Sequence, residues 1–130
     1  MPCLYLSTNV KLDGVNIDPI FTEATTAVST ITGKPEQFVM VLLKGSVSLM
    51  FEHNKEPAAY GELVAMGGII SKVKKDLIDT IGTILENNLS IPRTRFFSQK
   101  YLTQHFFKHD NNHSKLYVIV LSRVLLHLLK

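Results

Sequence analysis

The chain has 130 residues, enough for one domain with a real core but not for two. Residues 1–97 carry nine Lys and Arg against ten Asp and Glu, and the remainder carries five against one, so the net charge of +3 belongs to the C-terminal tail and a dedicated nucleic-acid surface is not expected. The 45% hydrophobic content is high and suggests apolar surface that an oligomer could bury.

The first part of the chain predicts a strand, a helix and a second strand. The N-terminal strand is expected over Cys3–Thr8. Asp18-Pro19 is a good helix start, an N-cap followed by proline, and Gly33 and Pro35 end the helix. Phe38–Leu43 then follows as a strand that is apolar at every position. The apolar face of the helix comprises Ile20, Phe21, Ala24, Ala27, Val28 and Ile31.

The same pattern then repeats. Ala59–Met66 is predicted as a strand, Gly67-Gly68 as a turn, and a second amphipathic helix is expected to end near Asn87–Asn88. Pro92 prevents its continuation, and Thr94–Phe97 begins another strand. The apolar positions of this helix are Ile70, Val73, Leu77, Ile81 and Ile84.

The repeat predicts the fold class. Residues 34–39 have a counterpart in residues 91–96, since both follow a helix and precede a strand. An α/β fold built from a duplicated β-α-β unit follows, with a four-stranded core sheet and two helices on one face. Because Phe38–Leu43 is apolar on both sides and two helices cover only one face, the other face is expected to meet another subunit.

Five short motifs carry a resemblance to a known family. They are Met1-Pro2, Ser7–Asn9, Thr32–Pro35, Glu56-Pro57 and Met66–Gly68. Their spacing over residues 1–97 resembles the macrophage migration inhibitory factor and D-dopachrome tautomerase family of the tautomerase superfamily, and the plant members look closest. The resemblance implies a homotrimer with an active site at each subunit boundary. It also implies a keto–enol tautomerase, an isomerase acting on small phenylpyruvate- or dopachrome-type substrates.

The implied general base is Pro2, freed by removal of Met1. A free α-amino group has a pKa of about 8, and desolvation together with a nearby cation lowers the pKa further. The resemblance assigns that cation to Lys34, which could also pair with a substrate carboxylate or an enolate oxygen. Met66 stands where the family places an apolar residue whose backbone N–H contacts the substrate. Without the other motifs, Pro2 is weak evidence for catalysis, and Lys34 is explained as a cation at the C-terminus of a helix.

The sequence departs from the family at the implied contribution of the neighbouring subunit. Phe97 and Gln99 stand where mammalian relatives have a tyrosine and an asparagine, and Phe97 can stack on a substrate but cannot donate a hydrogen bond. Residues 58–61 replace a Cys-x-x-Cys motif, so a thiol oxidoreductase activity does not carry over. These departures support an alternative of another class, a cytokine-like signalling or interaction protein with receptor-type partners and a weak or inactive site.

The resemblance fades beyond Phe97, so residues 1–104 are assigned to the tautomerase-like domain and residues 105–130 to an atypical tail. Within it, Asn111–Lys130 is expected either to be loosely ordered or to pack as an added peripheral element, and not to be needed for the core fold. His105, His109 and His113 share a four-residue spacing, but the intervening Asp110–Asn112 favours a linker over a metal site.

No cofactor, metal or membrane contact is expected. The single cysteine, Cys3, excludes an internal disulfide and a multi-cysteine zinc site. The apolar stretch Leu116–Leu129 is too short and too charged to span a bilayer. With no secretory signal recognised and the peroxisomal tripeptide Ser114–Leu116 internal, the expected location is the cytoplasm, with non-classical secretion left open.

Overall fold

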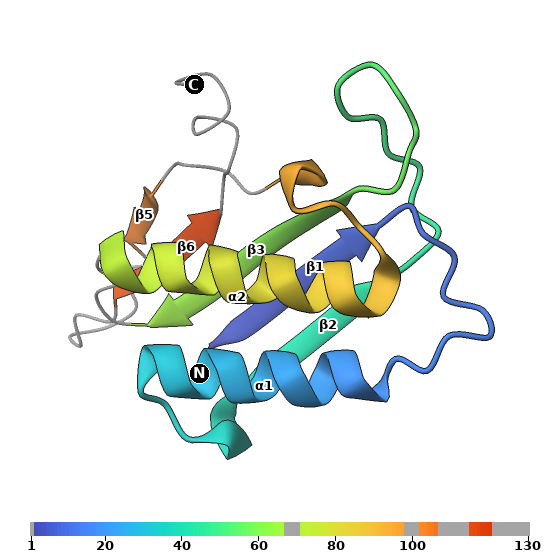
Figure 1. Ribbon diagram of the computed structural model, residues 1–130. Helices are drawn as coiled ribbons and strands as arrows, with labels where there is room; N and C mark the ends of the chain where they lie inside the picture. Colours follow the sequence, from blue (N-terminus) through green and yellow to red (C-terminus); the bar gives the residue numbers. More distant parts are fainter. Residues whose placement is uncertain (1, 67–70, 98–101, 107–114, 121–130) are drawn as a thin grey trace.

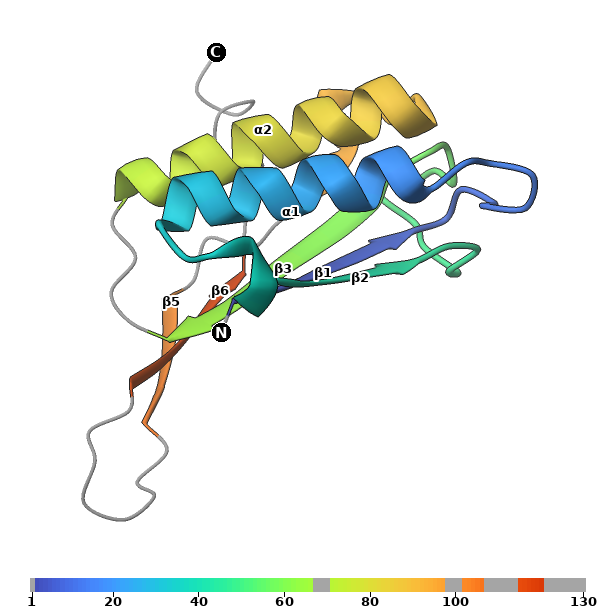
Figure 2. The same ribbon diagram turned by 90° about the horizontal axis from the view of Figure 1, so that it is seen from below.

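The structure, a computed structural model, describes residues 2–66, 71–97, 102–106 and 115–120 (Figure 1). In chain order the elements are β1 (Cys3–Thr8), α1 (Asp18–Thr32), a 3₁₀ helix (Glu36–Phe38), β2 (Met40–Lys44), β3 (Ala59–Met66), α2 (Ser71–Leu89), a second 3₁₀ helix (Arg93–Arg95), β4 (Phe96–Phe97), β5 (Leu102–Phe106) and β6 (Lys115–Val120). The two long helices run side by side in opposite directions and lie on one side of the sheet (Figure 2). The predicted α/β architecture with both helices on one face is confirmed.

The first strand begins where the sequence predicts, and the first helix begins one residue before its predicted start at Pro19. Asp18 lies in the first turn of α1, and Ile17 takes the N-cap position without a side-chain cap. The Asp18 N–H instead donates to Asn16 Oδ1 at 3.2 Å. A side chain two residues earlier therefore satisfies one of the free amides at the start of the helix.

The second strand starts two residues later than expected, at Met40 rather than Phe38. The cause is the 3₁₀ turn after Pro35, in which the Phe38 N–H donates to the Pro35 carbonyl at 3.0 Å. An apolar run alone does not distinguish such a turn from a strand.

The same turn follows Pro92, so the internal repeat is confirmed in the backbone. Pro35 has φ −58° and ψ 143°, and Pro92 has φ −56° and ψ 138°. The Arg95 N–H donates to the Pro92 carbonyl at 2.8 Å, which delays the strand expected from Thr94 until Phe96.

The sheet contains six strands rather than the four predicted, in the order β2-β1-β3-β6-β5 with β4 also on β3. β1 is parallel to β2 and antiparallel to β3, while β4 pairs in parallel with only Ala59 and Tyr60. The difference arises because β6 occupies the edge of β3 beyond β4, pairing antiparallel with Glu62–Met66, and β5 extends the sheet from β6.

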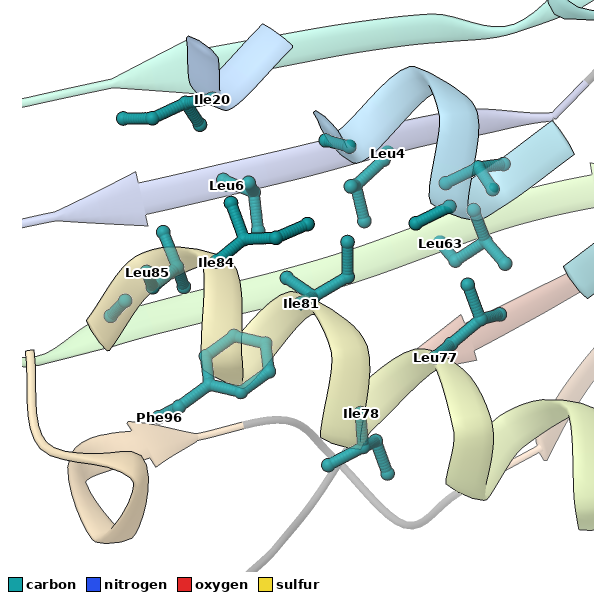
Figure 3. Packing of buried hydrophobic residues seen from close by; sticks show 14 of the residues in the cluster. Leu4, Leu6, Ile20, Leu63, Leu77, Ile78, Ile81, Ile84, Leu85 and Phe96 are labelled. Carbon is teal, nitrogen blue, oxygen red and sulfur yellow. The ribbon is translucent and has the colours of Figure 1, made fainter. Parts of the chain in front are cut away.

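The hydrophobic core lies between the helix pair and strands β1 and β3 (Figure 3). Leu77, Ile81 and Ile84, predicted from their spacing, are buried there, whereas Ile70 lies outside the described residues. The core cluster comprises Leu4, Leu6, Ile20, Ala24, Ala27, Val28, Ala59, Leu63, Leu77, Ile78, Ile81, Ile84, Leu85, Leu89, Ile91 and Phe96.

The opposite face of the sheet has no helix over it among the described residues and exposes large apolar side chains. Along β2, Met40 is 51% and Leu42 is 45% exposed, whereas Val41 and Leu43 pack against the core. Tyr5 of β1, which pairs with Leu42, is 42% exposed on the same face. We call Tyr5, Met40 and Leu42 the open-face cluster. Met40 and Leu42 are the exposed apolar side of the strand that the sequence predicts to be apolar on both faces.

The predicted tail, residues 105–130, begins inside strand β5 of the sheet. β5 includes residues on both sides of the boundary predicted at residue 104, and β6 pairs with β3, so the domain division stays a prediction. Residues 107–114 and 121–130 lie outside the described part of the chain. Neither described helix is long and apolar enough to cross a membrane.

We expect truncation after Gln104 to leave a soluble, folded body. The core cluster that the structure describes lies between Leu4 and Phe96, so the truncated chain keeps all of it. Far-ultraviolet circular dichroism with α1, α2 and β1–β3 intact should resemble that of the full chain. An insoluble or unfolded product would show that β6 completes the core.

Candidate active site

Pro2 lies at the N-terminal end of β1 and is buried. Its carbonyl accepts a hydrogen bond from the Met40 N–H at 3.0 Å, and Cys3 pairs with Met40 in the parallel ladder. Pro2 is therefore fixed at the end of the sheet where the parallel strands β1 and β2 both begin.

Lys34 follows the end of α1, in the connection that leads to the first residue of β2. Gly33 has φ +74°, a left-handed conformation that suits glycine, and its N–H donates to the Ser29 carbonyl at 2.9 Å. Ser29 Oγ donates to the Lys34 carbonyl at 2.6 Å, so the backbone of Lys34 is fixed while its side chain is exposed. From there the chain passes through the first 3₁₀ turn into β2, whose first residue is bonded to Pro2.

Met66 is the last residue of β3, at this end of the sheet. The antiparallel register places Val64 opposite Cys3, so the chain reaches Met66 just beyond Pro2. Three of the five predicted site residues, Pro2, Lys34 and Met66, therefore belong to segments that meet at one end of the sheet. This arrangement follows from the directions of β1, β2 and β3.

Phe97 lies at the other end of β3, where it pairs with Tyr60. Six residues of extended strand separate Tyr60 from Met66, about 20 Å at the usual rise per residue. A single chain thus does not bring Phe97 to Pro2. Gln99 lies outside the described residues.

Two tyrosines and an acidic residue share the open face between these ends. The hydrogen bond and charge of Cys3, followed by desolvation and then by the charge of Glu62, raise the pKa of Tyr5 above its ordinary value of 10.0. Burial, followed by the charge of Glu62, raises the pKa of Tyr60 in the same direction. Both phenols therefore stay protonated around neutral pH.

The outer surface of the helix pair carries a groove of about 960 Å³ that includes none of the predicted site residues. Its walls include Thr22, Thr26 and Thr30 from α1 and Thr80 and Thr83 from α2. Nor do the described residues contain a group of three or more His, Cys, Asp or Glu that could hold a metal. His105 lies in β5, and His109 and His113 lie outside the described part.

Sequence reasoning gave no role to Arg95, which the structure shows to be buried and to donate three hydrogen bonds to backbone carbonyls. It also gave none to Asn9, whose side chain bonds the backbone of residues 55, 56 and 58. The motifs Ser7–Asn9 and Glu56-Pro57 gave the only signal, and they meet at this point.

Comparison with known proteins shows one family. The sequence model described as macrophage migration inhibitory factor matches residues 1–103. The macrophage migration inhibitory factor homolog of Trichinella spiralis is 34% identical over 98 residues, covering 75% of this chain and 84% of the relative. The homolog of Trichuris trichiura is 29% identical over the same length and shares. A closest relationship to plant members stays a prediction.

Solved structures of this name share the fold. The crystal structure of Leishmania major MIF2 superposes with a TM-score of 0.72 at 24% identity, covering 88% of this chain and 97% of that one. The structure of the macrophage migration inhibitory factor from Trichinella spiralis gives 0.67 at 24% identity, with 87% and 98% covered. The likeness extends over nearly the whole length of both known structures.

Proposed function

Because the chain belongs to the macrophage migration inhibitory factor family, we propose that it is a keto–enol tautomerase whose base is Pro2. The observation that carries the proposal is the burial of Pro2 where β1 and β2 begin and β3 ends, beside the segment of Lys34. An amine in such a place is desolvated, and desolvation favours its neutral form. We propose small carboxylates of the phenylpyruvate or dopachrome type as substrates.

The proposed reaction moves one proton from a carbon to an oxygen of the substrate. No electrons pass to another molecule. Once Met1 is removed, the neutral secondary amine of Pro2 takes a proton from the carbon next to the substrate carbonyl. The electrons of that C–H bond form the enolate, whose oxygen charge Lys34 stabilises. The protonated amine then returns its proton to the oxygen, which gives the enol, and the reverse sequence gives the ketone.

Assembly as a homotrimer would complete this site. Phe97 and Pro2 lie at opposite ends of the sheet within one chain, so an aromatic contact from Phe97 must reach the Pro2 of another subunit. The open-face cluster supplies apolar surface for such association. The sharing of sites between subunits is thereby part of the proposal.

A cytokine-like interaction protein with a weak or inactive site is the second candidate. It is favoured by Phe97, which cannot donate the hydrogen bond of a tyrosine. Turnover of phenylpyruvate by protein lacking Met1, measured beside pull-down of receptor-type partners, separates the two. Catalysis above buffer supports the tautomerase, and binding without catalysis supports the interaction protein.

Lys34→Ala is expected to raise KM for phenylpyruvate by about 10-fold, because the substrate carboxylate loses a charged partner. A cation near Pro2 disfavours protonation of its amine, so removing Lys34 should also raise the pKa of Pro2. The rate depends on the neutral amine, and the acidic limb of the pH–rate profile should therefore move to higher pH.

The matched control is Lys11→Ala, which removes an exposed lysine in the loop after β1, at the opposite end of that strand from Pro2. It should leave both KM and the pH profile unchanged. Equal behaviour of the two variants would mean that Lys34 only caps a helix.

A further inference from the structure

The segment of residues 51–58, here called the entry segment, leads into β3 and is held by the side chain of Asn9. Asn9 Nδ2 donates to the carbonyls of Lys55 at 3.1 Å and Glu56 at 2.9 Å. Asn9 Oδ1 accepts the Ala58 N–H at 2.9 Å. One amide side chain from the end of β1 therefore fixes three backbone groups of this segment.

Arg95 also holds the entry segment, and it shares the Glu56 carbonyl with Asn9. Its Nε donates to the Pro57 carbonyl at 3.0 Å, and its Nη2 donates to the carbonyls of Phe51 and Glu56, both at 3.2 Å. The guanidinium carbon also lies 5.3 Å from the centre of the Phe51 ring. Only 6% of Arg95 is exposed, and burying a guanidinium is costly unless its N–H groups are satisfied. These contacts join Arg95 and the entry segment into one unit.

The entry segment begins with a strained turn. Glu52 and His53 have φ values of +51° and +61°, which side chains other than glycine rarely adopt. Phe51 and Asn54 close the turn through backbone bonds of 3.0 and 3.2 Å. Because Arg95 binds the Phe51 carbonyl, it supports the turn at its base.

The entry segment and Phe97 flank the same short stretch of β3. A cavity of about 340 Å³ lies here, lined by Leu49, Met50, Phe51, Ala58, Ala59 and Tyr60. Tyr60 pairs with Phe97, and Ala59 pairs with Phe96, the residue after Arg95. Arg95 thus links the cavity wall to the strand that carries Phe97.

We propose that Arg95 is a positioning residue that acts in the neighbouring subunit's site. It holds the entry segment and Phe97 in the arrangement that completes the site built around the neighbour's Pro2. Arg95 lies near the β4 end of the sheet in its own chain, away from its own Pro2, so its effect on the reaction has to pass through a second subunit. The inference rests on the proposed function, in which Phe97 contacts the ring of the substrate.

Arg95→Met should raise KM for phenylpyruvate by about 10-fold, the scale of one lost aromatic contact. The acidic limb of the pH–rate profile, set by Pro2, should stay in place. Arg95→Lys should not rescue KM, since an ammonium lacks the planar fork that serves three carbonyls. Arg93→Met, which removes a half-buried arginine from the same 3₁₀ turn, is the matched control and should keep the wild-type KM.

A subunit-mixing experiment tests the direction of the effect. Mixed trimers of Pro2→Ala and Arg95→Met chains, assayed at phenylpyruvate concentrations well below KM, should regain about a quarter of wild-type activity. That is the share of boundaries at which an intact Pro2 meets an intact Arg95 from the next chain in a random threefold assembly. Activity no higher than the mean of the two parents would overturn the proposal, because Arg95 would then act on its own subunit.

Folding and function are checked separately. If Arg95→Met fails to fold by circular dichroism, Asn9→Ala takes its place, since it removes the other side chain that holds the same segment. Wild-type protein without turnover would defeat the proposed function and this inference with it. Wild-type turnover without recovery in mixed trimers would defeat the inference alone.

Discussion

Replacing Pro2 with Ala should lower kcat/KM for phenylpyruvate by about 10²-fold or more, the effect of removing a positioned general base. The variant keeps an N-terminal amine but exchanges a rigid secondary amine for a flexible primary one. Pro2 is buried and its carbonyl is bonded to Met40, so the ring is held in one orientation that alanine does not reproduce. The measurement is the rate of enol-to-ketone conversion as a function of pH.

Two checks make the result interpretable. The N-terminal mass of both proteins must show that Met1 is absent, and their circular dichroism must agree. A Pro2→Ala protein as active as the wild type would mean that the buried proline serves the fold and that another group is the base.

Leu42→Asp should convert the proposed trimer to monomers and abolish turnover in the same step. Leu42 lies in the open-face cluster, 45% exposed in the isolated chain, and a carboxylate buried there between subunits would lose its hydration without a partner. Turnover should vanish because Phe97 and Pro2 of one chain are too far apart to share a substrate. Light scattering at micromolar concentration, run beside the phenylpyruvate assay, measures both effects.

The matched control is Val15→Asp, which places the same charge at an exposed apolar residue in the loop before α1. It should remain trimeric and active. A wild-type protein that is monodisperse as a monomer would refute the shared site before any variant is made, and an active Leu42→Asp monomer would do so afterwards.

The regular elements could be predicted where local pattern alone decides them. The bounds of β1 and β3 agree with the sequence to the residue, and α1 begins at Asp18, the residue expected as its N-cap. The starts of β2 and β4 could not be predicted, because the residue types in the 3₁₀ turns after Pro35 and Pro92 are equally compatible with an extended strand. The two added strands were missed because pairing of β6 with β3 joins segments about 50 residues apart.

The candidate site also has a part that the sequence predicts and a part that only the structure shows. Pro2, Lys34 and Met66 were named through family resemblance, and the strand directions bring their segments together. The role of Arg95 was not predicted, because its three acceptors are backbone carbonyls and the pattern of side chains in the sequence does not indicate them. Its neighbour Phe97 was identified, but its distance from Pro2 depends on the sheet register and could be known only from the structure.

Exchange of deuterium into the carbon next to the carbonyl of phenylpyruvate tests the role of Pro2 most directly. Two forms of the otherwise unchanged chain are compared in deuterium oxide, one with Met1 removed and one with Met1 retained, each confirmed by mass. Exchange above the buffer rate is predicted for the form with a free Pro2 amine and not for the other. Equal exchange by both forms, or none by either, would contradict proline-based catalysis.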